Sequence, residues 1–133
     1  MIKPFKLQLR FRDLDLLGHV NNCVYLSYFE VARVYYFEQL LGREWDYKKE
    51  GFLLAKNEVV YLRPILLKDK PEISMFVTSI GTKSFTLGYE IHVDGAIVTT
   101  GSSVMVAFDS VANTSIPIPT KLKEALLSIQ SKN

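Results

Sequence analysis

One long apolar segment, residues 23–41, limits the folds open to this chain. It contains no proline or glycine, and its spacing predicts an α-helix that ends at Gly42. Apolar residues cover most of the helix circumference, and the polar exceptions are Ser27, Glu30, Arg33, Glu38 and Gln39. Because a one-sided surface helix shows a narrower apolar stripe, this helix is expected to be covered by other structure on nearly all sides.

Strand patterns lie on both sides of this helix in the sequence. Residues 5–12 alternate apolar and polar side chains, which predicts a strand with one wet face. Further strands are predicted over residues 52–62, 72–80, 85–93 and 96–108, and Asp94-Gly95 is a hairpin signal between the last two. A C-terminal helix is predicted from Pro119 onward.

This order of elements predicts an α+β fold. A curved antiparallel sheet of about five strands, wrapped around the long central helix, would bury that helix, and a C-terminal helix would follow. The length of 133 residues and the lack of a linker or repeat indicate a single domain spanning residues 1–133.

The composition excludes several classes of partner. The chain is 48% hydrophobic and 23% charged, as in an ordinary soluble protein, and its formal net charge of +2 argues against nucleic acid as the main partner. No apolar run reaches the length of a membrane span, and the amino terminus does not resemble a secretory signal. A single cysteine precludes an intramolecular disulfide, and the cytoplasm is the expected compartment.

Residues 13–22 hold the most reactive set of side chains. They contain Asp13, Asp15, His19, Asn21 and Asn22, directly before the predicted helix. Either asparagine is suited to cap that helix. A carboxylate in front of a helix N-terminus can attack or deprotonate, while unpaired backbone N–H groups of the first turn hold a developing negative oxygen.

The string F-R-D-L-D-L-L-G-H-V-N-N-x-x-Y-L-x-Y-F-E-x-A-R, residues 11–33, resembles the hotdog-fold acyl-CoA thioesterases. The similarity is greatest to the 4-hydroxybenzoyl-CoA thioesterases and the short bacterial acyl-CoA thioester hydrolases. Residues 61–64 and 83–85 extend the resemblance along the chain. It implies a hotdog fold, hydrolysis of acyl-CoA to the free acid and CoA, and a homodimer or homotetramer whose sites are lined by two chains.

The same resemblance implies roles for particular residues. Asp15 corresponds to the catalytic acid, as general base or as nucleophile, and the backbone N–H near Asn22 polarises the thioester carbonyl. The plant acyl-carrier-protein thioesterases share a related string but have an asparagine where this chain has Leu17, so their asparagine-assisted mechanism is not carried over. His19 is open between a catalytic and a structural role.

Weaker assignments complete the candidate site. Substrate binding, including the phosphates of coenzyme A, is assigned to Gly18, Arg63, Lys83 and Ser84. No cofactor is expected, and with only two histidines no metal site is predicted. Acyl carrier protein is an alternative carrier of the acyl group.

Four other residues are expected to have structural roles. Cys23 is expected to be a small buried residue of the first helical turn in preference to a nucleophile. Glu30 and Arg33 are expected to pair with each other or to contact a second subunit. Asp13 is expected to shape the loop.

Two other functions fit the same pattern. An enoyl-CoA hydratase or dehydratase of the same fold would add or remove water, and it typically pairs an acid and a histidine at wider spacing than Asp15 and His19. A non-catalytic acyl-CoA or acyl-carrier-protein binding module would bind without turnover. Product analysis and an Asp15→Asn variant distinguish these functions.

Overall fold

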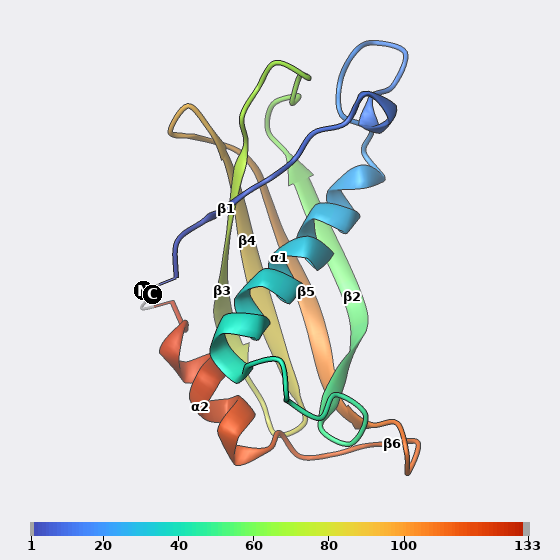
Figure 1. Ribbon diagram of the computed structural model, residues 1–133, viewed down its shortest axis with the longest axis vertical. Helices are drawn as coiled ribbons and strands as arrows, with labels where there is room; N and C mark the ends of the chain where they lie inside the picture. Colours follow the sequence, from blue (N-terminus) through green and yellow to red (C-terminus); the bar gives the residue numbers. More distant parts are fainter. Residues whose placement is uncertain (1, 132–133) are drawn as a thin grey trace.

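A curved antiparallel sheet packs against one long helix in the computed structural model, which describes residues 2–131 (Figure 1). Helix α1 (Val24–Leu41) crosses one face of the sheet, and the shorter α2 (Thr120–Ser128) lies beside its C-terminal half. The strands occur in the spatial order β1 (Phe5–Lys6), β3 (Glu72–Ile80), β4 (Ser84–Val93), β5 (Ala96–Asp109) and β2 (Gly51–Tyr61), and β6 (Thr114–Ser115) pairs with the end of β5. The predicted α+β architecture is confirmed.

The four long strands begin and end within one residue of the predicted positions. Their alternation explains this accuracy: in β3, for example, Ile73, Met75 and Val77 are buried while the residues between them are less so. The Asp94-Gly95 turn was also predicted correctly. Both residues have positive φ, 51° and 81°, as a tight hairpin between twisted strands requires.

The centre of the core is an aromatic stack between α1 and the sheet. The fully buried ring of Phe29 lies 4.1 Å from that of Tyr89 on β4, with an interplanar angle of 4°. Gly101 on β5 allows this approach, because a Cβ there would be 2.3 Å from the Phe29 ring. Helix α1 therefore packs closely against the sheet at Gly101, where β5 has no side chain.

The predicted strand over residues 5–12 is mostly wrong. Only Phe5 and Lys6 pair with β3, and the chain turns through a short 3₁₀ helix at Phe11–Asp13. A local interaction explains the difference: the carboxylate of Asp13 accepts the Arg10 N–H at 3.0 Å, so this amide bonds locally and not to a strand.

The expectation that α1 is covered on nearly all sides is also wrong for a single chain. Its sheet-facing side is buried, but the opposite side exposes Leu26, Val31 and Val34. One sheet can cover only one side of a helix, so these residues remain open to solvent unless another chain covers them. Neither helix of the described residues is long and apolar enough to cross a membrane.

The two edges of the sheet differ. The edge formed by β3 is covered by β1, by a hydrogen bond from the Leu7 N–H to the Pro71 carbonyl (3.0 Å), and by bonds between Val77 and the C-terminal segment. The outer edge of β2, eleven residues long, pairs with no strand of the described residues. Long unpaired edges favour association with another strand.

Four buried tyrosines predict a loss of stability at alkaline pH. Burial raises the pKa of Tyr25, Tyr28, Tyr36 and Tyr89 above the ordinary value of 10.0. The folded state therefore holds these phenol protons more tightly than the unfolded chain, so stability is fully present below about pH 10 and falls as the pH rises above it. Urea midpoints measured on both sides of this pH test the prediction, and a Tyr36→Phe variant should lose less stability. A midpoint that does not change would contradict it.

Candidate active site

The segment between Asp13 and Asn21 folds as a short hairpin in front of α1. Leu14 bridges to Val20, and the Asp15 N–H donates to the His19 carbonyl at 2.8 Å. The turn closes with a 3.1 Å bond from the Gly18 N–H to the Asp15 carbonyl. Gly18 has φ = +78°, a conformation that favours glycine, so its role here is to make the turn.

The two carboxylate oxygens of Asp15 have different environments. Oδ1 accepts the N–H of Leu17 at 2.9 Å and that of His19 at 3.1 Å. Oδ2 has no hydrogen-bond partner among residues 2–131. One oxygen therefore fixes the orientation of the side chain, and the other is available for chemistry.

The backbone N–H groups before α1 are mostly occupied. The amides of Val20 and Asn21 donate to the carbonyls of Ile65 and Asp13, both at 2.8 Å. Asn21 then caps the helix, since its Oδ1 accepts the Cys23 N–H at 3.0 Å and its carbonyl accepts the Val24 N–H at 2.9 Å. In this stretch of described residues only the Asn22 N–H has no acceptor.

A cleft of about 210 Å³ joins these groups. Its polar lining comes from Asp15, His19, Asn22, Tyr61 and Arg63, and its apolar lining from Val20, Tyr25, Leu62 and Pro64. The hairpin is held against the segment after β2 by the Val20 bond to Ile65 and by a bridge between His19 and Leu66. Predicted residues 15, 19, 22 and 63 thus lie together.

Tyr61 is a member of this cleft that the sequence analysis did not single out. Its hydroxyl donates to the Asn22 carbonyl at 2.9 Å, and its ring meets that of Tyr25 edge-on at 4.9 Å. The residue therefore ties the end of β2 to the start of α1. Its position at the start of the segment 61–64 was the signal available.

Other predicted residues lie elsewhere. Lys83 and Ser84 are at the turn between β3 and β4, at the opposite end of the sheet from the Asp15 hairpin, so one chain does not bring them to the cleft (Figure 1). Gly18 makes the turn of the hairpin but does not line the cleft. The predicted burial of Cys23 is wrong, because the residue precedes the helix and its thiol is exposed.

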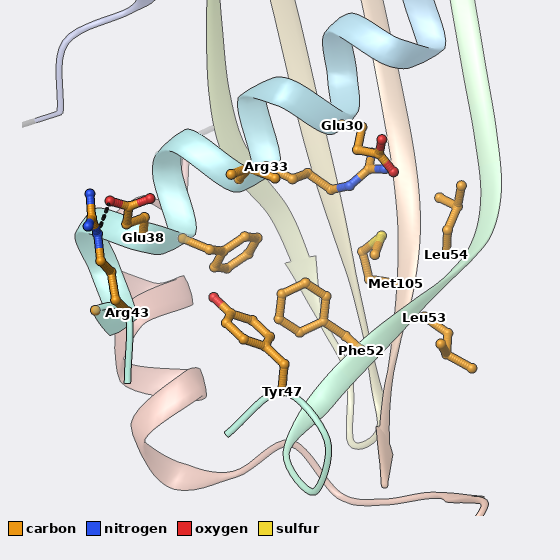
Figure 2. A pocket seen from close by; sticks show the side chains of 12 residues that line it. Glu30, Arg33, Glu38, Arg43, Tyr47, Phe52, Leu53, Leu54 and Met105 are labelled. Atoms are coloured by element: carbon orange, nitrogen blue, oxygen red, sulfur yellow. Dashed lines mark hydrogen bonds and ion pairs between the residues drawn. The ribbon is translucent and has the colours of Figure 1, made fainter. Parts of the chain in front are cut away.

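A larger groove lies away from Asp15, between α1 and β2. It encloses about 560 Å³, and its walls are mainly apolar, including Val34, Phe37, Phe52, Leu53, Leu54 and Met105 (Figure 2). Arg33 projects into it and donates to the Tyr89 hydroxyl at 2.9 Å, whereas no ion pair joins it to Glu30 within the described residues. The expected pairing of Glu30 with Arg33 within the chain is therefore absent.

Comparisons with known proteins assign the family. The model of the thioesterase-like superfamily matches residues 9–126. The chain is 26% identical to the long-chain acyl-CoA thioesterase FadM of Escherichia coli over 91% of this chain and 94% of FadM, and 29% identical to YsmA of Bacillus subtilis over 92% and 83% of the two chains.

Among solved structures, a Thermus thermophilus thioesterase crystallised with coenzyme A and zinc superposes with a TM-score of 0.84 at 34% identity, covering 98% of this chain and 95% of its own. Across residues 2–131 of this chain, no three His, Cys, Asp or Glu side chains gather into a metal-binding cluster. The chain belongs to the thioesterase-like superfamily and is a thioester hydrolase of the hotdog fold.

Proposed function

We propose that the protein hydrolyses acyl-CoA at the cleft beside Asp15. The observation that carries this proposal is that two residues lining the cleft, Asp15 and Asn22, each keep one group without a hydrogen-bond partner among residues 2–131: the Asp15 Oδ2 and the Asn22 N–H. These are the two groups that thioester hydrolysis requires: a base or nucleophile, and a donor for the carbonyl oxygen.

The reaction can begin in two ways. As general base, Asp15 Oδ2 takes a proton from water while the water oxygen attacks the thioester carbonyl. As nucleophile, Oδ2 attacks the carbonyl itself and forms a mixed anhydride that water then hydrolyses. In both routes the carbonyl oxygen becomes an oxyanion, which the Asn22 N–H stabilises by roughly 3–4 kcal/mol, the worth of such a donor in hydrolases.

The leaving group completes the reaction. The carbon–sulfur bond breaks, the electron pair leaves with the thiolate of coenzyme A, and the thiolate takes up a proton. The imidazole of His19 lines the same cleft and is suited to pass that proton. We assign it this assisting role and reserve attack or base catalysis for Asp15.

Coenzyme A is the proposed carrier because one cation lines the cleft and two more lie near its lining residues in the sequence. Arg63 lines the cleft, and the segments on either side carry the exposed cations Arg12 and Lys68. Cationic side chains bind phosphate groups by charge-assisted hydrogen bonds. The complex of the Thermus thermophilus relative with coenzyme A supports the same carrier.

A panel of acyl-CoA substrates tests the proposed function. Short-chain, long-chain and aromatic acyl-CoAs, and one acyl carrier protein loaded with the best acyl group, are incubated with the protein, and loss of the thioester and appearance of free acid are measured. Hydrolysis of an acyl-CoA supports the proposal. Hydration of a 2-enoyl-CoA without release of coenzyme A would favour the hydratase, and tight binding with no turnover would favour the binding module.

We also propose that two copies of the chain pair through β2. The unpaired edge of β2 lies beside the exposed apolar residues of α1 and the apolar groove between the two elements. An antiparallel pair of β2 strands would cover all three. It would also place the start of one β2, at the groove, beside the end of the other, at Tyr61 in the cleft. The groove of one copy would then extend the cleft of the other and hold the acyl group.

Leu54→Asp is expected to dissociate this pair. Leu54 is exposed on β2 in the groove, so a carboxylate there leaves the single chain folded. In a pair that sets position 51 opposite position 61, it would lie opposite the carboxylate of Glu58 of the partner subunit, and like charges directly opposite each other destabilise a strand pair. Sedimentation should show a dimer for the wild-type protein and a monomer with reduced thioesterase activity for the variant. Leu127→Asp, which changes an exposed leucine of α2, is the control and should remain dimeric. A monomeric wild-type protein would refute the pairing.

A further inference from the structure

A buried tyrosine of α1 is bonded to the base of the Asp15 hairpin. Tyr28 is 5% exposed, and its hydroxyl donates to Asp13 Oδ2 at 3.0 Å. The same oxygen accepts the Arg10 N–H at 3.0 Å. One carboxylate oxygen thus joins the second turn of the helix to the chain that enters the hairpin.

The backbone of Asp13 closes the hairpin at its other end. Its carbonyl accepts the Asn21 N–H at 2.8 Å, and Asn21 is the residue that caps α1. Asp13 therefore touches the start of the hairpin, its end and the helix. Asp15 lies two residues from this junction, and the unpaired Asn22 N–H lies one residue beyond it.

We propose that Tyr28 is a positioning residue for thioester hydrolysis, which acts through Asp13 to hold the Asp15 carboxylate and the Asn22 N–H at a fixed separation. The inference rests on the proposed function of the cleft. Neither Tyr28 nor Asp13 lines the cleft, so neither is expected to touch the substrate.

The hydrogen bond from Tyr28 to Asp13 is expected to persist at neutral pH. Burial, and then the hydrogen bond to Asp13, raise the pKa of the Tyr28 hydroxyl. The hydroxyl therefore keeps its proton and remains a donor throughout the neutral pH range. A hydrogen bond from a neutral donor to a carboxylate is stronger than one to a neutral acceptor, and the donor side of this bond, Tyr28, is buried.

The hairpin has few other bonds to the body of the protein. Its base is fixed by Asp13, and its middle by the contacts of His19 and Val20 with residues 65 and 66. Loss of the Tyr28 hydroxyl leaves the contacts of His19 and Val20 intact. The hairpin should therefore remain in place, but the distance between Asp15 and Asn22 should be less well defined. A misplacement of about 1 Å is enough to lower a rate about 100-fold.

Tyr28→Phe is the primary test, with Tyr36→Phe as its matched control. Both tyrosines are buried on α1, but the hydroxyl of Tyr36 is directed to Ser74 and Met75 on β3, away from the hairpin. We expect Tyr28→Phe to lower kcat for the best acyl-CoA about 10- to 100-fold with little change in KM. Tyr36→Phe should keep the wild-type kcat, even if it lowers thermal stability by a similar amount.

A second measurement follows the hairpin itself. In Tyr28→Phe the amides of Asn21 and His19 should exchange with solvent faster than in the wild-type protein, whereas in Tyr36→Phe they should not. In a cycle with Asp13→Ala, which has no side-chain oxygen to accept from the Tyr28 hydroxyl, the double variant should be no slower than the slower single variant, because Tyr28 acts only through the Asp13 side chain.

The outcomes separate this inference from the proposed function. If the wild-type protein does not hydrolyse thioesters, the proposed function fails, and the exchange measurement still tests the mechanical link. If it does hydrolyse them but Tyr28→Phe retains the kcat of Tyr36→Phe, the positioning role of Tyr28 is refuted. Additive effects in the cycle would also refute it.

Discussion

Replacing Asp15 by asparagine is expected to lower kcat for acyl-CoA about 10²- to 10⁴-fold, the usual contribution of a positioned base. The amide oxygen of asparagine can still accept the N–H groups of Leu17 and His19, so the hairpin should keep its shape. The group that changes is the free oxygen, which becomes an NH₂ that neither accepts a proton nor attacks a carbonyl. Binding of acyl-CoA should persist, which steady-state kinetics and calorimetry can show.

Asp109→Asn is the matched control for this variant. Asp109 Oδ1 also accepts two backbone N–H groups, those of Val111 and Ala112, both at 2.9 Å, but at the opposite end of the sheet. The control removes the same charge from the same kind of turn and should keep wild-type kcat. If both variants are equally active, Asp15 is a structural residue and the proposed mechanism is wrong.

Isotope labelling can then distinguish the two routes. In a single turnover in heavy-oxygen water, a labelled Asp15 carboxylate identifies the nucleophilic route, because only water attack on the Asp15 carbonyl carbon of the anhydride places the labelled oxygen there. The general-base route transfers the label to the product acid alone. Mass spectrometry of the peptide that contains Asp15 reads the difference.

The largest loss of stability is expected from Phe29→Ala. The Phe29 ring is fully buried and stacks on Tyr89, and truncation of such a residue costs about 3–5 kcal/mol. The upper part of that range applies here, because Gly101, which the ring approaches closely, has no side chain that could fill the void. Since a domain is stable by only about 5–15 kcal/mol, the variant should be close to unfolding at room temperature.

Urea unfolding gives the free energy of unfolding for this variant. Gln39→Ala, on the exposed side of the same helix, is the control and should change it by no more than about 0.5 kcal/mol. A loss below about 1 kcal/mol in Phe29→Ala would mean that the core closes over the missing ring.

Local alternation and turn chemistry were sufficient to predict the sheet. They fail where a side chain competes with the backbone: residues 5–12 alternate like a strand, but Asp13 accepts the Arg10 N–H and bends the chain. Local patterns also fail to predict contacts between segments that are distant in the sequence or belong to different chains. The exposed side of α1 reads as core in the sequence, because periodicity does not show whether one sheet or a second chain covers an apolar face.

The site was predictable where its residues are close in sequence. Asp15, His19 and Asn22 lie within eight residues and share one cleft. Tyr61 reaches them only through the pairing of β2 with β5, which the sequence does not encode in any short motif. Lys83 and Ser84 were grouped with Arg63 because all three lie near strand ends, but these strand ends lie at opposite ends of the sheet and are far apart.

The single exposed thiol has a practical consequence for any study of this reaction. Cys23 is adjacent to Asn22, and no other residue of the chain would react with a maleimide or a disulfide reagent in the same way. A reagent that detects released coenzyme A through its sulfhydryl would therefore also modify the enzyme beside the proposed oxyanion donor. The same residue accepts one fluorophore per chain, at a position where its emission should respond when an acyl-CoA enters the cleft.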